Sequence, residues 1–256
     1  MTQIAITRAV SASLGQCELT HQDRMSIDLD LARKQHAEYE ACLESLGCEL
    51  LRLPELPALP DAVFVEDTAV VLDEVAVITR PGAASRRPEI ESVAGALKPF
   101  RTLLQFESPG TVDGGDVLAI GKDIYVGLSS RSNEQAVTQM RAELAVYGYS
   151  VHGVEVSGCL HLKSAVTLVS ANTVLVNPNW IDPCSFAKHR TIEVHPDEVY
   201  AANGLLIGET VIYPTTFPRT AERLSKQGIG IESVDLSEMA KAEGAVTCCS
   251  LVFTHS

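Results

Sequence analysis

Five residues with reactive or polar side chains recur at a nearly even spacing along this chain of 256 residues. They are Glu66, Asp113, His161, Asn203 and Cys248, and successive positions differ by 47, 48, 42 and 45 residues. Each stands just before a short apolar segment with the length of a buried strand. If one structural unit repeats at this spacing, equivalent positions of the units can meet at a common axis. A thiol, an imidazole and carboxylates gathered there would suit nucleophilic catalysis with acid–base assistance.

The thiol of Cys248 is the candidate nucleophile, and a packed, inert core cysteine is the alternative interpretation. A reactive thiol needs a base or a cation beside it, and His161 occupies the equivalent place two units earlier. A single histidine is more often structural, so the pairing depends on the shared repeat position. Cys249 is expected to point to the opposite face of the following strand and to pack inside.

Acidic residues gather in the same part of the repeat, including Asp61 and Asp116. Glu66 and Asp67 lie within an apolar run, where a carboxylate is costly to bury unless it meets a cation or hydrogen-bond donors. A guanidinium group supplies both. Asp113 is followed by two glycines, which allow the backbone to approach a ligand closely. These residues predict a floor that binds a cation, whereas solvated surface acids are the alternative.

Arg86 and Arg131 follow the strand pairs of two adjacent predicted units. Surface ion pairing is the more common fate of arginine, but two arginines at equivalent places could also hold an α-carboxylate. A pocket with acids at its floor and arginines at its mouth would fit arginine or an N-substituted arginine.

The elements that must position these residues follow one repeated order: strand, tight turn, strand, loop and helix. A helix over residues 29–46, capped by Asp28 and ended by Gly47, is predicted near the start of the chain. An α/β domain whose elements merely alternate is the alternative. We predict one α/β domain over residues 1–256, in which an N-terminal strand (residues 4–10) and a C-terminal strand (residues 250–253) close the ring. The other predicted elements are strands 65–72, 75–79, 116–120, 124–127, 165–170, 173–176, 205–207 and 210–213, helices 89–97 and 133–147, and a helix ending at residue 228.

Composition and net charge exclude some classes of function and favour others. Apolar residues make up 46% and charged residues 21% of the chain, as in ordinary soluble domains. The net charge of −13 disfavours nucleic-acid binding and favours cationic small molecules. No apolar run reaches the roughly 18 residues of a membrane span and no leader pattern is present, so we expect a soluble, cytoplasmic protein. The seven cysteines form no CxxC pair and are expected to be reduced thiols. A homodimer is left open.

Seven segments in order resemble the guanidine-modifying (amidinotransferase, or pentein) superfamily, and within it the dimethylarginine dimethylaminohydrolase family. The resemblance covers nearly the whole chain. Two positions depart from some relatives of that family, since Asp113 stands in place of a glutamate and Gly204 in place of a cysteine. The segments are residues 13–16, 60–67, 78–87, 111–117, 160–164, 200–203 and 246–251.

The resemblance implies a five-bladed α/β-propeller with pseudo-fivefold symmetry. It implies that Cys248 is the nucleophile, His161 the general acid and base, and Asp113 the carboxylate that partners the histidine. The substrate-binding residues that it implies are Leu19 and Ala242 through backbone contacts, Asp61, Glu66 and Asp67 as acids, and Arg86 and Arg131 as the carboxylate clamp.

The implied activity is hydrolysis of asymmetric dimethylarginine or monomethylarginine to citrulline and dimethylamine or methylamine, through a covalent S-alkylthiouronium on cysteine. No cofactor or metal is required, although a thiol with an imidazole could capture zinc. Arginine deimination, amidino transfer and hydrolysis of another N-substituted arginine use the same groups, so the access loop at residues 15–27 would decide among them. A binding propeller without catalysis is the alternative from a different class.

Overall fold

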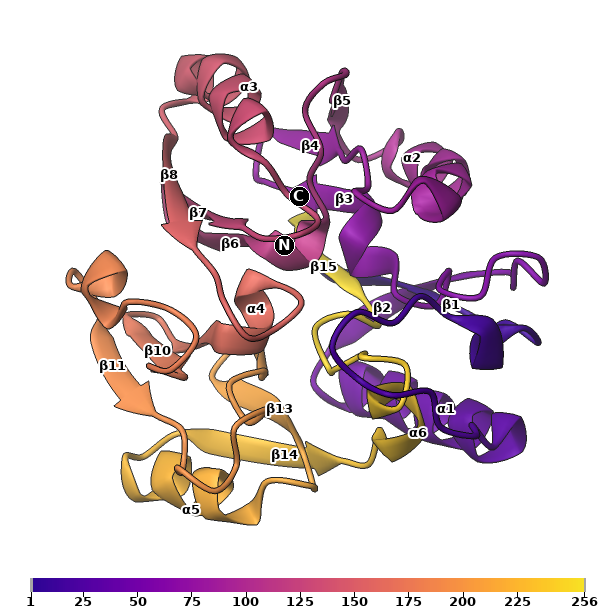
Figure 1. Cartoon of the computed structure of the whole chain (residues 1–256), viewed down its shortest axis with the longest axis vertical. Coiled ribbons are helices and arrows are strands. Elements are labelled where there is room, and N and C mark those ends of the chain that lie inside the picture. Colours follow the sequence, from indigo (N-terminus) through magenta and orange to yellow (C-terminus); the bar gives the residue numbers. More distant parts are fainter. Residues whose placement is uncertain (1, 256) are drawn as a thin grey trace.

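In the computed structural model, which describes residues 2–255, the strands form five sheets of three strands each around a common axis (Figure 1). This arrangement confirms the predicted five-bladed, pseudo-fivefold α/β-propeller. We call the sheet that joins both ends of the chain the split blade and number the others second to fifth in chain order. The split blade contains β15 (Leu251–His255), β1 (Thr2–Arg8) and β2 (Cys48–Leu53); the second, β3 (Ala69–Val71), β4 (Val75–Ile78) and β5 (Thr102–Gln105); the third, β6 (Val117–Ile120), β7 (Asp123–Leu128) and β8 (Ser150–Glu155); the fourth, β9 (Val166–Ser170), β10 (Thr173–Val176) and β11 (Arg190–Glu193); and the fifth, β12 (Leu205–Ile207), β13 (Thr210–Pro214) and β14 (Gly230–Val234).

Every blade has the same strand pairing. Its first two strands are antiparallel, and its middle strand runs parallel to the third. A parallel pair needs a crossover connection, which here carries a helix on the outside of the ring (Figure 1). The crossover helices are α1 (Leu29–Ser45), α2 (Ile90–Leu97), α3 (Glu134–Leu144) and α5 (Pro218–Lys226), and the fourth blade has a short 3-10 turn at Pro183–Phe186 instead.

The third strand of each blade was not predicted. These strands lie at the outer edge of their sheets, and their side chains are largely exposed or half-buried, as in β5 and β11. An edge strand keeps polar residues and therefore lacks the continuous apolar run that marks a buried strand. The predicted units were correct for the inner pair of strands and lacked the edge strand.

The first strands of the second, third and fourth blades begin after a helical turn. The predicted strand start at residue 65 was therefore four residues too early, and those at residues 116 and 165 were one residue too early. The 3-10 turns η2 (Val65–Thr68) and η4 (Gly114–Asp116) precede β3 and β6, and the short helix α4 (Leu162–Ala165) precedes β9. The Thr68 hydroxyl donates to the Val65 carbonyl at 2.7 Å, which satisfies one backbone acceptor within η2. The polar repeat residues therefore lie in tight turns at the entrances to the inner strands.

Closure of the ring occurs as predicted, with boundaries shifted by a few residues. In the split blade β1 is antiparallel to β15, with Ile4 opposite Phe253 and Ile6 opposite Leu251. Figure 1 shows the two strands side by side, with the marked chain ends close together. The turn that carries Cys248 leads directly into β15.

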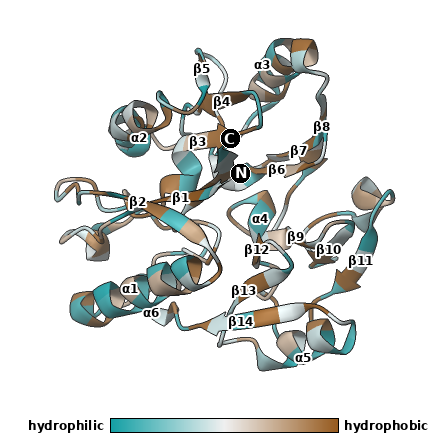
Figure 2. Ribbon diagram, turned by 180° about the vertical axis from the view of Figure 1, so that it is seen from behind, coloured by the Kyte–Doolittle hydropathy of each residue, from teal (hydrophilic) through white to brown (hydrophobic). Residues whose placement is uncertain are grey.

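The helices pack one face onto the blades. Asp28 caps α1 as predicted, since its carboxylate accepts from the backbone N–H groups of Asp30 and Leu31 at 3.1 Å. In α3, which matches most of the predicted helix 133–147, Val137, Met140 and Leu144 are buried at the spacing of one helix face. Figure 2 shows mostly hydrophobic inner strands and hydrophilic residues along the outward sides of the helices. Among residues 2–255, no helix combines the length and the apolar character needed to cross a membrane.

Candidate active site

The repeat residues converge at the axis of the propeller, each at the entrance to the inner strand of a different blade. His161 Nε2 lies 3.1 Å from Asp113 Oδ2, although the two are 48 residues apart. The backbone N–H of Glu66 donates to the Cys248 carbonyl at 3.2 Å. Asn203 Oδ1 accepts from the backbone N–H of Thr247, the neighbour of Cys248, at 3.1 Å. The spacing seen in the sequence is therefore the spacing of the blades.

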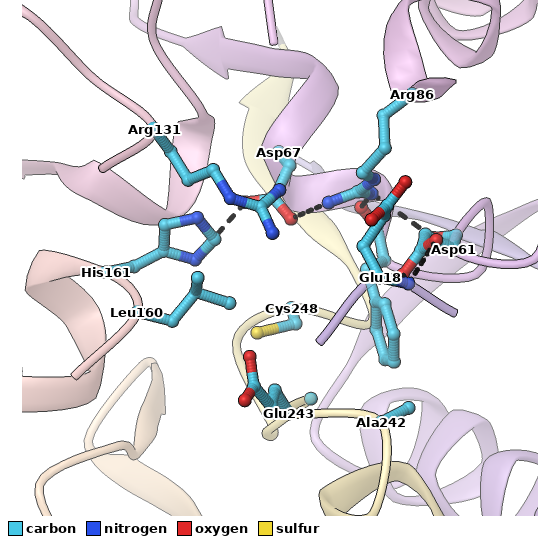
Figure 3. A pocket seen from close by; sticks show the side chains of 12 residues that line it. Glu18, Asp61, Asp67, Arg86, Arg131, Leu160, His161, Ala242, Glu243 and Cys248 are labelled. Carbon is cyan, nitrogen blue, oxygen red and sulfur yellow. Dashed lines mark hydrogen bonds and ion pairs between the residues drawn. The ribbon is translucent and has the colours of Figure 1, made fainter. Parts of the chain in front are cut away.

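A small pocket opens beside His161 and Cys248 (Figure 3). Its free volume of about 20 Å³ is enough for little more than a water molecule. Of the predicted site residues, Leu19, Glu66 and Asp113 lie outside it. Those that line it are Asp61, Asp67, Arg86, Arg131, His161, Ala242 and Cys248, together with Glu18, Phe64, Leu160, Glu243 and Gly244, which the sequence did not single out.

Cys248 is half-buried and lines the pocket, whereas Cys249 is fully buried. Cys249 donates its thiol hydrogen to the Ala245 carbonyl at 3.6 Å and packs in a hydrophobic cluster. Both lie in a turn, so the predicted alternation along a strand is not the reason that they point apart. Burial, and then the negative charges of Glu66 and Asp67, raise the pKa of the Cys248 thiol well above its ordinary value. A cation in the pocket would oppose that effect and favour the thiolate.

His161 is buried between two carboxylates. Besides Asp113, its ring meets Asp67, whose Oδ1 lies 3.8 Å from Nδ1. Burial alone would lower the pKa of His161, but Asp67, Asp113 and Asp116 together raise it to about 9. The ring is therefore a cation at neutral pH and holds a proton that it can donate beside the thiol.

Asp67 and Arg86 form a buried ion pair, with Nη1 of the arginine 2.5 Å from Oδ2. Burial alone would raise the pKa of Asp67, but His161 and Arg86 lower it to about 2. Arg86 also donates from Nε and Nη2 to Glu89 and from Nη2 to the carbonyls of Asp61 and Phe64. All three of its nitrogens are thus engaged inside the protein.

Arg131 reaches the pocket from the opposite side (Figure 3). Its Nη2 donates to the Thr20 hydroxyl at 3.0 Å, and its Nη1 lies 3.8 Å from Asp113 Oδ2. Neither contact is a close ion pair like those that Arg86 makes with Asp67 and Glu89. The Arg131 guanidinium is therefore the better placed of the two to exchange a partner for an incoming anion.

The access loop predicted at residues 15–27 lies against the pocket and is held by two carboxylates. Asp61 accepts from the backbone N–H of Glu18 at 3.1 and 3.2 Å. Glu243 accepts from the backbone N–H groups of Thr20, His21 and Gln22, with shortest distances of 3.0, 2.6 and 2.7 Å. Leu19 lies within this segment and packs against the core beside it. A ligand larger than the present pocket would require this loop to shift.

Three predicted acids stand behind the pocket residues. Asp113 is fully buried and accepts from the backbone N–H of Gly82 at 2.8 Å while it contacts His161. Glu66 accepts from Lys163 Nζ and from the Thr247 hydroxyl, both at 2.7 Å. Asp116, whose pKa burial raises to about 6, accepts from two serine hydroxyls and the backbone N–H of Leu162. These contacts orient the turns that carry the pocket residues.

Lys163 and Thr247 are site residues to which sequence reasoning assigned no role. Lys163 follows His161 by two residues, and Thr247 directly precedes Cys248. Both donate hydrogen bonds to Glu66, although they belong to different blades from it. Their position beside a repeat residue was the available signal, but the partner of each could not be read from the sequence because it lies on a different blade.

Asp67, Asp113 and His161 offer ligand atoms that lie within 4.8 Å of one another, as a metal ion would require. A metal binds neutral imidazole, so it would have to displace a proton from a ring whose pKa is about 9. The charges of this group therefore favour a proton over a metal ion.

The chain is similar to known proteins over most of its length. The family model described as N,N dimethylarginine dimethylhydrolase, eukaryotic, matches residues 12–194. Two curated proteins named N(G),N(G)-dimethylarginine dimethylaminohydrolase are similar: that of Streptomyces coelicolor is 40% identical over 249 residues, 96% of this chain and 95% of its own, and that of Pseudomonas aeruginosa is 36% identical over 228 residues, 88% and 90%. A solved structure of the Pseudomonas aeruginosa protein, a cysteine-to-serine mutant complexed with citrulline, has a TM-score of 0.94, 34% identity and coverage of 99% and 100%. The similarity thus extends over the whole ring of blades.

Proposed function

Because this chain belongs to the dimethylarginine dimethylaminohydrolase family, we propose that it hydrolyses N-methylated arginine to citrulline and a methylated amine. The observation that carries the proposal is the pocket itself, where the thiol of Cys248 and the charged ring of His161 stand beside the carboxylate of Asp67. These are the nucleophile, the proton donor and the anion that attack on a guanidinium carbon requires.

In this proposal the guanidinium end of the substrate enters toward Asp61, Asp67 and Cys248. Its positive charge is favoured by the carboxylates and brings the Cys248 thiol toward its thiolate form. Glu66, which the sequence suggested as a direct ligand, contributes its charge from behind the thiol, since Lys163 and Thr247 occupy its oxygens.

The carboxylate end of the substrate lies at the arginines. We assign the direct contact to Arg131, because Arg86 already uses its three nitrogens on Asp67, Glu89 and backbone carbonyls. Arg86 then acts through its charge and through its hold on Asp67. Backbone groups of Leu19 and Ala242 complete the site, with the access loop moved outward to admit the substrate.

The chemistry proceeds in two displacements. The thiolate sulfur attacks the guanidinium carbon, and the bond from that carbon to the methylated nitrogen breaks as His161 donates its proton to the leaving amine. The result is an S-alkylthiouronium on Cys248. His161, now neutral, takes one proton from water as the water oxygen attacks the same carbon. The carbon–sulfur bond then breaks and the second proton of that water passes to solvent, which leaves citrulline, the thiolate and a charged His161. Asp113 keeps the ring oriented through both steps.

The first test is the reaction itself. Purified protein is incubated with asymmetric dimethylarginine, monomethylarginine or arginine, and citrulline is measured together with dimethylamine, methylamine or ammonia. We expect citrulline and dimethylamine in equal amounts from the first substrate. Conversion of arginine to citrulline and ammonia, with no dimethylamine from dimethylarginine, would instead make the protein a deiminase.

A cytoplasmic location is a further part of this proposal. All seven cysteines are free thiols in the structure, and Cys184 is exposed. Free thiols, one of them exposed, are typical of a reducing compartment. Fractionation of cells that produce the protein, followed by detection in the soluble and membrane fractions, tests the location.

A further inference from the structure

Asn203 is the repeat residue of the fifth blade, and the proposed reaction gives it no chemical step. Its side chain is nevertheless buried, and both of its polar atoms are hydrogen-bonded. Nδ2 donates to the backbone carbonyl of Lys163 and to the hydroxyl of Thr247, each at 3.0 Å, and Oδ1 accepts from the backbone N–H of Thr247 at 3.1 Å. The Asn203 amide is therefore hydrogen-bonded to both the backbone and the side chain of Thr247.

These bonds fix the direction of the Thr247 hydroxyl. The Lys163 carbonyl can only accept, so the amide nitrogen of Asn203 must face it, and that nitrogen can only donate to Thr247. The single hydroxyl proton of Thr247 is then free to point at Glu66, whose Oε2 lies 2.7 Å away. Lys163 holds the other oxygen of Glu66 at 2.7 Å and accepts from Asn203 at its backbone carbonyl, which closes a cycle of four residues.

The cycle includes Thr247, which lies in the turn that carries Cys248. Glu66, Lys163, Asn203 and Thr247 come from four different blades. Glu66 adds a backbone bond, since its N–H donates to the Cys248 carbonyl at 3.2 Å. The residue before the thiol is therefore bonded through its backbone and its hydroxyl, and the thiol residue itself is bonded through its carbonyl.

We propose that Asn203 is a positioning residue for the nucleophile: through Thr247 it fixes the turn that carries Cys248 and keeps the Thr247 hydroxyl on Glu66. This inference rests on the proposed function in so far as Cys248 is the nucleophile. Loss of the Asn203 amide would free the hydroxyl to rotate away from Glu66. The charge of Glu66 would then act on the thiol with less compensation, and the thiolate would form less readily.

The alternative is a purely structural role, in which Asn203 only links blades through its hydrogen bonds, as many buried asparagines link neighbouring segments. Asn177 offers a matched control within the same chain. It is fully buried, its Nδ2 donates to the Val199 carbonyl at 2.7 Å, and its Oδ1 accepts from the backbone N–H of Asn179 at 3.0 Å. It lies after β10, outside the pocket and outside the cycle around Cys248.

The experiment compares Asn203→Ala, Thr247→Val and Asn177→Ala in the full chain. For each variant we measure thermal stability, kcat and KM with asymmetric dimethylarginine, and the rate at which iodoacetamide alkylates Cys248 as a function of pH. We expect Asn203→Ala and Thr247→Val to lower kcat about 10- to 100-fold with little change in KM. Their alkylation profiles should shift to higher pH. A variant that combines Asn203→Ala with Thr247→Val should lose no more kcat than either single variant, because both changes break the same contact.

Asn177→Ala should lose thermal stability but keep the wild-type kcat and alkylation profile. If Asn203→Ala also keeps both and loses only stability, Asn203 is structural and the inference is wrong. Should that variant fail to fold, Thr247→Val decides alone, since valine keeps the shape of threonine without its hydroxyl. If wild type does not hydrolyse dimethylarginine, the proposed function fails, and the alkylation profiles still decide the role of Asn203.

Discussion

The two adjacent cysteines at the axis differ in the environment of their sulfur atoms. Cys248 lines the pocket, and Cys249 packs in the core with its thiol on the Ala245 carbonyl. We expect Cys248→Ser to lower citrulline formation about 1000-fold or more. Cys249→Ser should retain most of the activity and lose stability, because a hydroxyl replaces a packed thiol.

Turnover of both variants, with mass spectrometry of wild type after alkylation, checks this prediction. Activity in Cys248→Ser combined with an inactive, folded Cys249→Ser would show that the nucleophile had been assigned to the wrong sulfur.

His161 gives a prediction for stability against pH. Its pKa rises from 6.5 to about 9 on folding, so the folded state is favoured by the extra proton below about pH 6.5. That contribution, about 3 kcal/mol at most, is lost as the pH rises through about 9. The free energy of unfolding of wild type, relative to that of His161→Gln, should therefore fall between pH 6.5 and 9.

Denaturant titrations at several pH values measure that difference. A difference that stays constant across the range would mean that His161 does not carry the extra proton in the folded protein.

Single residues were predictable where the repeat marks them. Cys248, His161 and Asp113 stand at equivalent positions, and the structure brings them to one axis. The contacts of Glu66 were not foreseen, because an acid in an apolar run indicates that a cation is near without saying which. The structure supplies that cation from Lys163, 97 residues away.

At the scale of elements, the turn η4 allows the Asp67 carboxylate and the His161 imidazole to lie close together against the backbone. A Cβ at Gly115 would lie 2.6 Å from His161 Nδ1 and 2.8 Å from Asp67 Oδ1, closer than atoms can pack. The backbone N–H of Gly115 also donates to Asp67 at 2.9 Å. The need for glycine here comes from close approach to site residues.

We therefore expect Gly115→Ala to displace His161 and Asp67 and to lower kcat/KM about 100-fold. Its cost in unfolding free energy should be about 1–3 kcal/mol. Gly95→Ala is the matched control, since a Cβ there enters open space within α2 and should stabilise by about 0.5–1 kcal/mol. Kinetics and denaturant unfolding of both variants provide the measurement, and full activity of Gly115→Ala would contradict the argument.

Elements were predictable to the extent that they are buried. The inner strands and α1 followed from apolar runs and from the Asp28 cap. The edge strands did not, because the side chains of β5 and β11 are mostly exposed or half-buried and these strands are defined by their partners. Local signals also could not show that η2 and η4 precede the strands, since the same residues fit an extended or a helical turn.

At the scale of the whole molecule, the pairing of β1 with β15 joins the ring. Phe253 is buried opposite Ile4, with its ring 5.5 Å from that of Phe100 and 5.3 Å from the guanidinium carbon of Arg101. We propose that the chain unfolds as one domain. Phe253→Ala should then lower the free energy of unfolding by about 3–5 kcal/mol within a single transition.

Val146→Ala is the control, because Val146 is 81% exposed and should change stability by less than about 0.5 kcal/mol. Unfolding followed by circular dichroism and by the fluorescence of Trp180 measures both variants. Two separate transitions, with only one moved by Phe253→Ala, would argue against a single domain.

No strand is shared between two sheets in residues 2–255, so the blades are joined by side chains and loops. The pocket takes Asp67 from the second blade, Arg131 from the third, His161 from the fourth and Cys248 from the turn before β15. A molecule bound there contacts residues of four blades at once and so links the blades at the axis of the ring. A free ligand concentration of 100 times the dissociation constant raises the free energy of unfolding by about 2.7 kcal/mol. A rise in the melting temperature can therefore reveal the binding of compounds that the protein does not convert to product.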